Sequence, residues 1–387
     1  MRACVLRVPG LAPEIETVTL DPPGSGEVLV RVAAAGVCHS DLHLVDGALG
    51  EGRWPMVLGH EGAGVVEAVG EDVECPRPGD RVVFCMVASC GRCGPCVAGR
   101  PTLCEPAGAA SFAGELPTGG SRLRGAAGER LQHALTVACF AQYAVVAAAG
   151  AIAIGDGVPL WQAALLGCGA VTGFGAVAHA GGVRSGDRVA VIGCGGVGLQ
   201  VIAAARLAGA ATIVAVDRGS AKLERALRQG ATHAVDAGTE DAAGRVIELT
   251  GGGADRCFEV VGRAQTIRTA WDALRPGGTA VVVGLAPRGV DVSLPAIELL
   301  SEKALVGSYY GSGNPHETLG DLVALVRTGR LALDRVVSDL IELDGIADAL
   351  GRLRRGEGAR SVVVIDPELA GKQAERPQID SRLEGAA

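Results

Sequence analysis

Four cysteines lie close together in residues 90–104, with the spacing C-x2-C-x2-C-x7-C. They are Cys90, Cys93, Cys96 and Cys104. Zinc binds four thiolates tetrahedrally, and two-residue gaps let one turn of backbone present neighbouring sulfurs. Gly91, Gly94 and Gly99 allow the sharp reversals that this arrangement needs. The array predicts a closed, structural zinc site; disulfides, unrelated free thiols and an iron–sulfur cluster are the alternatives.

A glycine-rich turn of the pattern G-x-G-x-x-G follows the apolar stretch Arg188–Ile192 and opens an alanine-rich segment. Its residues are Gly193, Cys194, Gly195, Gly196, Val197 and Gly198. A strand, a turn and a helix in this order are typical of a dinucleotide site. Gly193 would make the tight turn, Gly195 would let a pyrophosphate approach, and Gly198 would allow close helix packing. The helix N-terminus would then face the phosphates. A glycine turn without a nucleotide is the alternative.

Asp217 stands at the end of the next predicted strand, nineteen residues after Gly198. A carboxylate at this place hydrogen-bonds the ribose hydroxyls of the cofactor and repels a 2′-phosphate, which favours NAD over NADP. Arg218 weakens this preference, because a neighbouring guanidinium is able to receive such a phosphate. Asp217 as a simple cap of the strand end is the other interpretation.

The composition limits the classes of protein that the chain can belong to. At 387 residues it exceeds one ordinary hydrophobic core, so we expect two domains. The net charge of −8 and the lack of a basic stripe argue against nucleic-acid binding. Charged residues and glycines interrupt every apolar stretch before about 18 residues accumulate, so no membrane-spanning helix is expected. The first residues run into a predicted strand without the features of a signal peptide, and we therefore expect a cytoplasmic protein.

Two regions differ in the period of their apolar residues. The first 150 residues, rich in Val, Gly and Pro, predict short strands between turns. From about residue 170, strands alternate with helices, which predicts a doubly wound parallel sheet. The expected elements there are 188–192, 197–208, 211–217, 222–229, 254–261, 264–274 and 279–285. Two helices (319–328 and 346–354) and a strand (361–365) follow, and we expect them to rejoin the first domain. Residues 366–387 are polar, and we expect them to be poorly ordered.

Three further segments carry a cysteine or a histidine. They are Cys38-His39-Ser40-Asp41-Leu42-His43, Gly59-His60-Glu61-Gly62-Ala63-Gly64 and Gly167-Cys168-Gly169. With the cysteine array and the glycine turn, they resemble the zinc-containing medium-chain alcohol dehydrogenases over residues 1–366. The resemblance implies a GroES-like, mostly β catalytic domain (1–169 and 309–366) enclosing a Rossmann domain (170–308), with residues 367–387 as a polar tail.

The resemblance also implies a second zinc, which would be catalytic. Its ligands would be Cys38, His60 and Cys168, which leave a fourth position open for water or alcohol. Asp41 would orient His60 from behind, and Glu61 would lie near the metal as a transient ligand. For both carboxylates an ordinary polar contact is the alternative.

The cofactor NAD(H) would be held by residues spread over the chain. The resemblance places His39 and Arg360 at the pyrophosphate, Lys222 at the adenosine ribose, and Thr172 and Val197 beside the nicotinamide. Leu285 is a further candidate for binding the cofactor. Zinc would polarise the substrate oxygen while a hydride passes to C4 of NAD+. Ser40 would take the proton first. The proton would then pass through the cofactor ribose to His43, which would exchange it with solvent, since the pKa of an unperturbed imidazole is about 6.5.

The substrate would be a small alcohol, or the aldehyde or ketone formed from it. Trp54, Met86, Leu285 and Tyr309 are candidates for the pocket wall. Since Met is adaptable, we expect a roomy apolar pocket for larger primary or aromatic alcohols. The stretch 116–136 resembles the long loop of dimeric relatives, so a homodimer is expected.

Two other functions remain open. In a glutathione- or other thiol-dependent formaldehyde dehydrogenase, an Asp, a Glu and an Arg usually stand where this chain has Leu49, Glu51 and Gly108, so one of three matches. That group also commonly has Tyr in place of His43. A non-catalytic protein that binds zinc and nucleotide would need no relay of Ser40 and His43.

Overall fold

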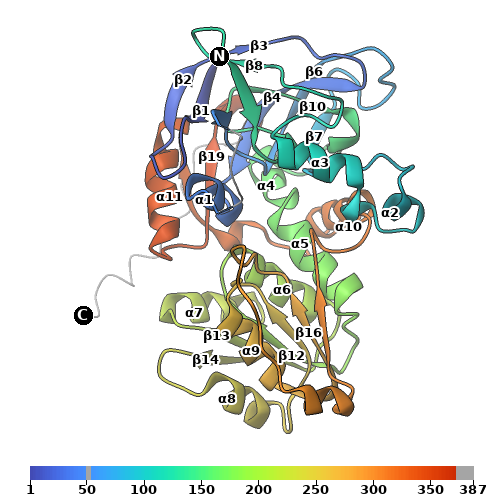
Figure 1. Cartoon of the computed structure of the whole chain (residues 1–387), viewed down its shortest axis with the longest axis vertical. Coiled ribbons are helices and arrows are strands. Elements are labelled where there is room, and N and C mark those ends of the chain that lie inside the picture. Colours follow the sequence, from blue (N-terminus) through green and yellow to red (C-terminus); the bar gives the residue numbers. More distant parts are fainter. Residues whose placement is uncertain (49–53, 372–387) are drawn as a thin grey trace.

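The computed structural model describes residues 1–48 and 54–371. Figure 1 shows a mostly β part that contains the N-terminus and a second part built around one sheet, with α5 between them. Helix α5 (Gly169–Gly175), continued by a π-helical turn (Ala176–Ala180), follows Cys168 directly. The three side chains predicted to bind the second zinc all come from the first part or from this junction.

The mostly β part contains two sheets. One has the order β2-β1-β5-β9-β8-β3, and the other β11-β7-β6-β4-β19-β18, with β10 also paired to β4. The strands are β1 (Arg2–Leu6), β2 (Glu14–Thr17), β3 (Thr19–Leu20), β4 (Glu27–Gly36), β5 (Met56–Val57), β6 (Gly62–Val69), β7 (Arg81–Phe84), β8 (Leu123–Arg124), β9 (Arg130–His133), β10 (Tyr143–Ala147), β11 (Ala151–Ala153), β18 (Val337–Ile341) and β19 (Arg360–Val364). The helices are α1 (His39–Val45), α2 (Gly94–Val97), α3 (Glu105–Ala113), α4 (Leu160–Ala163), α10 (Pro315–Arg327), α11 (Ile346–Arg354) and α12 (Pro367–Ala370).

Strand β19 brings the end of the chain back to the first part. It runs antiparallel to β4, with Val362 opposite Gly36 and Val364 opposite Ala34. Because Cys38 lies two residues after the end of β4, this register places Arg360 beside the start of α1, where it donates to the Val37 carbonyl. Two segments more than 300 residues apart therefore meet at the candidate metal site.

The second part is a six-stranded parallel sheet of the order β14-β13-β12-β15-β16-β17. In chain order this is 3-2-1-4-5-6, the Rossmann arrangement, whose ligands bind at the carboxyl ends of the strands where the order reverses. Its strands are β12 (Arg188–Ile192), β13 (Thr212–Asp217), β14 (His233–Asp236), β15 (Ala254–Glu259), β16 (Leu274–Val282) and β17 (Ala304–Gly307). Its helices are α6 (Gly196–Leu207), α7 (Ser220–Gln229), α8 (Ala242–Leu249) and α9 (Ala264–Asp272).

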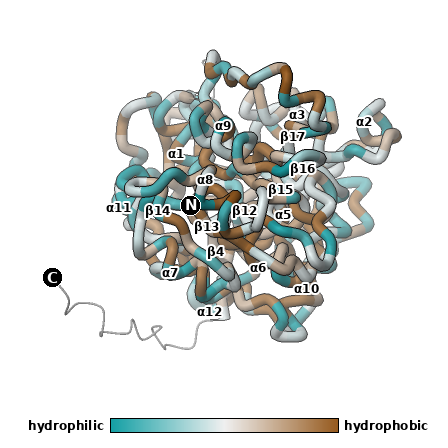
Figure 2. The backbone as a smooth tube through the Cα atoms, turned by 90° about the horizontal axis from the view of Figure 1, so that it is seen from below, coloured by the Kyte–Doolittle hydropathy of each residue, from teal (hydrophilic) through white to brown (hydrophobic). Residues whose placement is uncertain are grey.

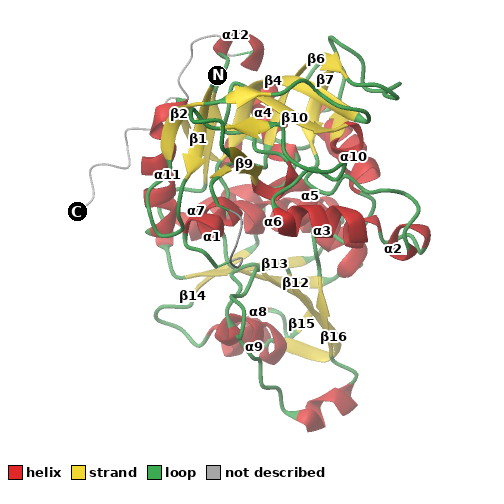
Figure 3. Cartoon of the chain, turned by 45° about the horizontal axis from the view of Figure 1, so that its top comes forward, coloured by secondary structure: helices red, strands yellow, loops and turns green. Residues whose placement is uncertain are grey.

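Helices cover both faces of this sheet (Figure 3). Successive residues of a strand point to opposite faces. Accordingly, Val189 and Val191 of β12 lie in the same apolar cluster as Ile202 of α6, whereas Ala190 lies in another with Trp271 of α9. Figure 2 shows the mainly apolar character of β12 and β13, as a strand buried on both faces requires.

The predicted fold class is confirmed, and most of the predicted elements agree with the structure within a few residues. The tail prediction is wrong for residues 367–370, which form α12: the Asp366 carboxylate accepts from the backbone N–H groups of Glu368 and Leu369, and Ala370 is fully buried. An N-cap and one apolar contact therefore order this segment despite its polar neighbours. The remainder of the predicted tail, 372–387, lies outside the described residues.

Among the described residues, no single helix is long and apolar enough to cross a membrane. Within the part of the chain that the structure describes, one pair of helices reaches that length and composition together, Leu160–Leu166 and Gly169–Ala180, which meet at a bend of 45°.

Candidate metal centres and nucleotide site

Three segments of the chain bring the residues of the predicted catalytic zinc site together. Cys38 is the N-cap of α1, His60 lies between β5 and β6, and Cys168 precedes α5. Their ligand atoms and a carboxylate oxygen of Glu61 all lie within 4.8 Å of one another, and the four residues are buried. The two sulfurs, Sγ of Cys38 and Sγ of Cys168, are 3.9 Å apart.

Asp41 orients the imidazole of His60. Its Oδ1 lies 3.0 Å from His60 Nδ1, and the same carboxylate accepts from the backbone N–H groups of Cys38 and Gly59. The other ring nitrogen, Nε2 of His60, is buried without a hydrogen-bond partner. A buried nitrogen left unpaired is costly, so this atom needs an acceptor or a metal. Its position beside two thiols fits a zinc ion.

The charges around the two thiols point to the same conclusion. The hydrogen bond from the Cys168 thiol holds the pKa of Cys38 well below its ordinary value, against the effect of burial. The same bond, together with burial, raises the pKa of Cys168. The surroundings of the pair therefore favour a negative charge on the Cys38 sulfur. That charge would stabilise a cation bound between the two sulfurs, as in a site with two thiolates and one imidazole.

Arg360 connects the candidate metal site with the glycine turn. Its Nη2 lies 2.9 Å from a Glu61 oxygen, and its Nη1 donates to the Val37 carbonyl at 3.0 Å. A Cβ built on Gly196 would lie 2.5 Å from Nε of Arg360, so the guanidinium stands at the N-terminus of α6. The contact of Arg360 with a pyrophosphate stays a prediction.

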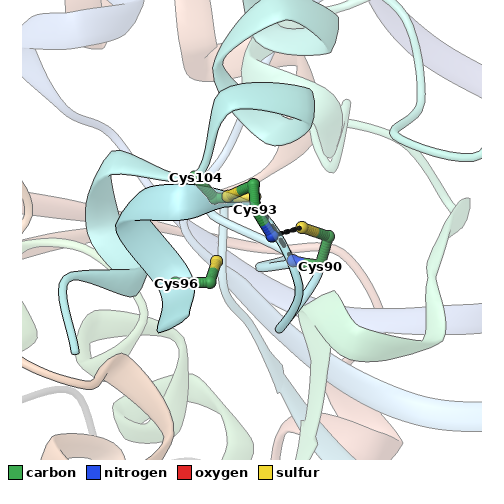
Figure 4. Close-up of side chains that lie close together, drawn as sticks. All are labelled: Cys90, Cys93, Cys96 and Cys104. Atoms are coloured by element: carbon green, nitrogen blue, oxygen red, sulfur yellow. Dashed lines mark hydrogen bonds between the residues drawn. The ribbon is translucent and has the colours of Figure 1, made fainter. Parts of the chain in front are cut away.

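The four cysteines of the array form a second cluster, in the lobe that contains α2 and α3 (Figure 4). Their sulfurs lie within 4.8 Å of one another. Backbone N–H groups of Arg92 and Cys93 lower the pKa of Cys90 to about 6, so this sulfur favours the thiolate that zinc binds. No disulfide joins any cysteines of the described residues. The geometry fits the predicted structural zinc.

The glycine turn has the shape that its sequence predicts. Gly193 has a φ of 100°, a conformation that favours glycine, and a Cβ on Gly198 would lie 1.8 Å from the Gly193 carbonyl oxygen. A Cβ on Gly195 would meet nothing within 4 Å, which leaves open space at the start of α6. Gly196 and Val197 form the first turn of this helix.

Asp217 is tied to the same turn. Its Oδ2 accepts from Cys194 N at 2.8 Å, and its Oδ1 accepts from the backbone N–H groups of Arg218 and Gly219. Lys222 lies 4.0 Å from it. Asp217 therefore does cap the end of the strand, as the alternative interpretation held. A role at the ribose is compatible with this and stays a prediction.

The remaining predicted residues occupy different environments. On α1, His39 is exposed, and Ser40 and His43 are partly exposed. The Ser40 hydroxyl lies 3.8 Å from the Cys38 sulfur. The ring centroids of His39 and His43 are 6.1 Å apart. Thr172 is partly buried on α5. Their roles stay predictions.

The predicted pocket residues are spread between buried and exposed positions. Trp54 and Met86 are partly buried against the same apolar cluster. Leu285 is 47% exposed and Tyr309 is 48% exposed. Their place in a substrate pocket stays a prediction.

Sequence reasoning missed Glu259, at the carboxyl end of β15. This fully buried carboxylate accepts from the backbone N–H groups of Val261 and Gly262 and from the Thr266 hydroxyl. The loop that it holds lies against the glycine turn, since a Cβ on Gly193 would lie 2.7 Å from Val261. The sequence feature that could have indicated this role is a Glu at the end of an apolar strand, three residues before a glycine.

A Rossmann sheet, a split β domain, a two-thiol, one-imidazole cluster and a four-cysteine lobe together define a zinc-containing dehydrogenase. The comparisons agree. Residues 24–156 match the family model of the alcohol dehydrogenase GroES-like domain, and residues 196–327 match that of the zinc-binding dehydrogenases. The chain belongs to the zinc-containing medium-chain alcohol dehydrogenase family, and its function is that of a zinc alcohol dehydrogenase.

Individual relatives differ in what they act on. An NDMA-dependent alcohol dehydrogenase of Amycolatopsis methanolica is 40% identical over 94% of this chain and 98% of its own length. An S-(hydroxymethyl)glutathione dehydrogenase of Saccharomyces cerevisiae is 36% identical over 91% of this chain and 93% of its own length. The structure of benzyl alcohol dehydrogenase from Acinetobacter calcoaceticus has a TM-score of 0.88 and 32% identity, covering 94% of this chain and 99% of that one.

Proposed function

We propose that the protein is an NAD-linked dehydrogenase that converts an alcohol reversibly to an aldehyde or ketone, with two zinc ions in each chain. The observation that carries the proposal is the buried, unpartnered Nε2 of His60 beside the sulfurs of Cys38 and Cys168. Cys38, His60 and Cys168 would hold the catalytic zinc, and Cys90, Cys93, Cys96 and Cys104 the structural one.

When bound, zinc supplies a Lewis acid for the substrate oxygen, and NAD+ supplies the hydride acceptor. The residues of the chain bind, orient and move the proton. Asp41 fixes the ring of His60 so that Nε2 faces the metal position. Ser40, next to Cys38, takes the proton of the alcohol. His43, partly exposed on the same helix, passes the proton to solvent.

NAD rather than NADP is proposed because Asp217 ends β13 and its carboxylate lies against the glycine turn, where a ribose hydroxyl would be bound. Its carboxylate is 14% exposed, and Lys222 is close enough to share the ribose. Arg218 is exposed. His39 and Arg360 would take the pyrophosphate, and Thr172 and Val197 the nicotinamide. Leu285 is a further candidate for binding the cofactor.

An aromatic or larger primary alcohol is the proposed substrate class. Trp54, Met86 and Tyr309 would line its pocket, and the benzyl alcohol dehydrogenase of Acinetobacter calcoaceticus has the same fold. A thiol adduct of formaldehyde is the second candidate, because the yeast relative is an S-(hydroxymethyl)glutathione dehydrogenase. Against it, Gly108 on α3 offers no cationic side chain; Leu49 and Glu51 lie outside the described residues.

An initial-rate screen tests the function. The zinc-loaded protein is assayed with benzyl alcohol, hexanol, ethanol and formaldehyde, each with NAD+, with NADP+, and with NDMA, the name-giving reagent of the Amycolatopsis relative. The formaldehyde series is repeated with glutathione. We expect NAD+-linked oxidation of benzyl alcohol and hexanol with a higher kcat/KM than ethanol. Formaldehyde oxidation that strictly requires glutathione would favour the second candidate. Turnover only in the presence of NDMA would contradict the proposal that NAD+ is the exchangeable cosubstrate of the enzyme.

We also propose a homodimer. Among the described residues, Ile297, Leu299 and Leu300, in the 3-10 helix Ala296–Ser301, are 72%, 55% and 80% exposed. They precede β17, the last strand of its sheet in the order given above. Apolar side chains beside an edge strand favour association with a second copy. Light scattering should give twice the chain mass; a monomer at micromolar concentration would contradict it.

A further inference from the structure

The chain returns from the Rossmann sheet to the β part through a sharp reversal. It follows β17 and precedes α10, and its residues Tyr310, Gly311 and Ser312 have φ values of 52°, 86° and 64°. Left-handed backbone is unusual for Ser and is an outlier for a residue as bulky as Tyr. Such a conformation persists only where the surroundings fix it, and it occurs often at functional sites.

The surroundings that fix this reversal flank Cys168 on both sides. The buried Tyr310 hydroxyl donates to the carbonyl oxygen of Gly167, the residue before Cys168. The same hydroxyl also has hydrogen-bond contacts with the Cys85 thiol and the Met86 backbone. Gly311 packs against α5, the helix that begins after Cys168: a Cβ on Gly175 would lie 2.6 Å from the Gly311 Cα. One short segment therefore contacts the backbone before and after a proposed zinc ligand.

Gly167 has little freedom on its other side. A Cβ at this position would lie 2.3 Å from the carbonyl oxygen of Phe84, at the end of β7. The backbone at Gly167 thus lies between a strand of the β part and the Tyr310 hydroxyl. Movement of the Tyr310 hydroxyl would be transmitted directly to Cys168.

We propose that Tyr310 is a positioning residue for the catalytic zinc site: its hydroxyl holds the Gly167–Cys168 peptide where the Cys168 sulfur meets Cys38 and His60. The inference rests on the proposed zinc site. It adds Tyr310, which lies 142 residues after Cys168 in the sequence, to the residues that determine how tightly that zinc is held. Groups behind a metal ligand orient the ligand, and their loss weakens metal binding.

Zinc release to a colorimetric chelator tests the inference on the full-length, zinc-loaded protein. Two release phases are expected in the wild type, one from the four-cysteine lobe and one from the candidate catalytic site. The phase that coincides with loss of activity belongs to the catalytic site. The Tyr310→Phe variant keeps the ring and removes only the hydroxyl. It should release this zinc about 5- to 10-fold faster, the effect expected from losing the hydrogen bond to Gly167.

Two controls make the result specific. The lobe phase of the same variant should keep its wild-type rate, whereas a general loss of stability would accelerate both phases. Tyr143→Phe, on β10, should change neither phase. Equal rates of the catalytic-site phase in Tyr310→Phe and wild type would overturn the inference while leaving the function intact. A wild-type protein with only the lobe phase would instead overturn the zinc site itself.

Discussion

Asp217→Asn should change the cofactor preference of the enzyme. The substitution removes one negative charge at the end of β13 with little change of shape. A hydrogen bond to a charged acceptor contributes about 1.5–3 kcal/mol, so the loss should raise the KM for NAD+ about 10- to 150-fold. Two like charges about 5 Å apart repel by about 1 kcal/mol in bulk water and about 3 kcal/mol at an effective dielectric of about 20. Removing the carboxylate should therefore raise kcat/KM for NADP+ about 5- to 150-fold.

The ratio of the two kcat/KM values is the decisive quantity. The amide introduced by Asp217→Asn would keep one acceptor for the backbone N–H groups that Asp217 now binds, so the turn loosens to the same extent for both cofactors. That contribution cancels in the ratio, which should shift toward NADP+ by at least about 50-fold. The matched control is Asp236→Asn, because Asp236 is the in-register neighbour of Asp217 on β14 and its carboxylate accepts from Gly238 N in its own turn. A shift below about 3-fold, or an equal shift in the control, would refute the role of Asp217 at the ribose.

Three further predictions concern other parts of the molecule. Burial lowers the pKa of His133 to about 4, below its ordinary value of about 6.5. The folded protein therefore holds His133 neutral, and the resulting stability is complete above pH 6.5 and is lost as the pH falls toward 4. Lowering the pH from 7 to 5 should destabilise the wild type by about 2 kcal/mol more than the His133→Gln variant. Denaturant unfolding at both pH values measures this difference, and equal losses in the two proteins would contradict it. Ser40→Ala should lower kcat about 100-fold or more. His43→Gln should slow the reaction mainly at low pH, because little solvent hydroxide is then present to accept the proton in place of the imidazole. A pH–rate profile of each variant checks both predictions, and an unchanged profile in His43→Gln would remove His43 from the relay. Cys96→Ser should lose about one zinc per chain and lower the thermal midpoint while the other zinc stays, as metal analysis and calorimetry would show; loss of both ions together would mean that the two sites are not independent.

Local patterns predicted the parts of the structure that local contacts determine. Arg188–Ile192 was expected as a strand and is β12, and the four cysteines of the array lie close in sequence and in space. The short strands β14 and β17 were not predicted, because four residues carry too little periodicity to distinguish a strand from a loop.

Contacts between segments distant in the sequence could not be predicted from local sequence patterns. Cys38 and Cys168 are 130 residues apart, and only the family resemblance joined them. The Glu61–Arg360 ion pair spans 299 residues and was not expected at all. Nothing in the residues around Tyr310 indicates that its hydroxyl reaches Gly167, since the fold alone brings the two together.

Zinc content measured together with activity tests the central claim most directly. The wild type, purified without chelators, is compared with His60→Ala by metal analysis and by NAD+-linked oxidation of benzyl alcohol. His60 supplies the one imidazole of the candidate site, and the four-cysteine lobe does not involve it. We predict about two zinc ions per chain in the wild type, and about one with no detectable turnover in His60→Ala. A fully active wild type with about one zinc per chain, or an active His60→Ala, would contradict the account.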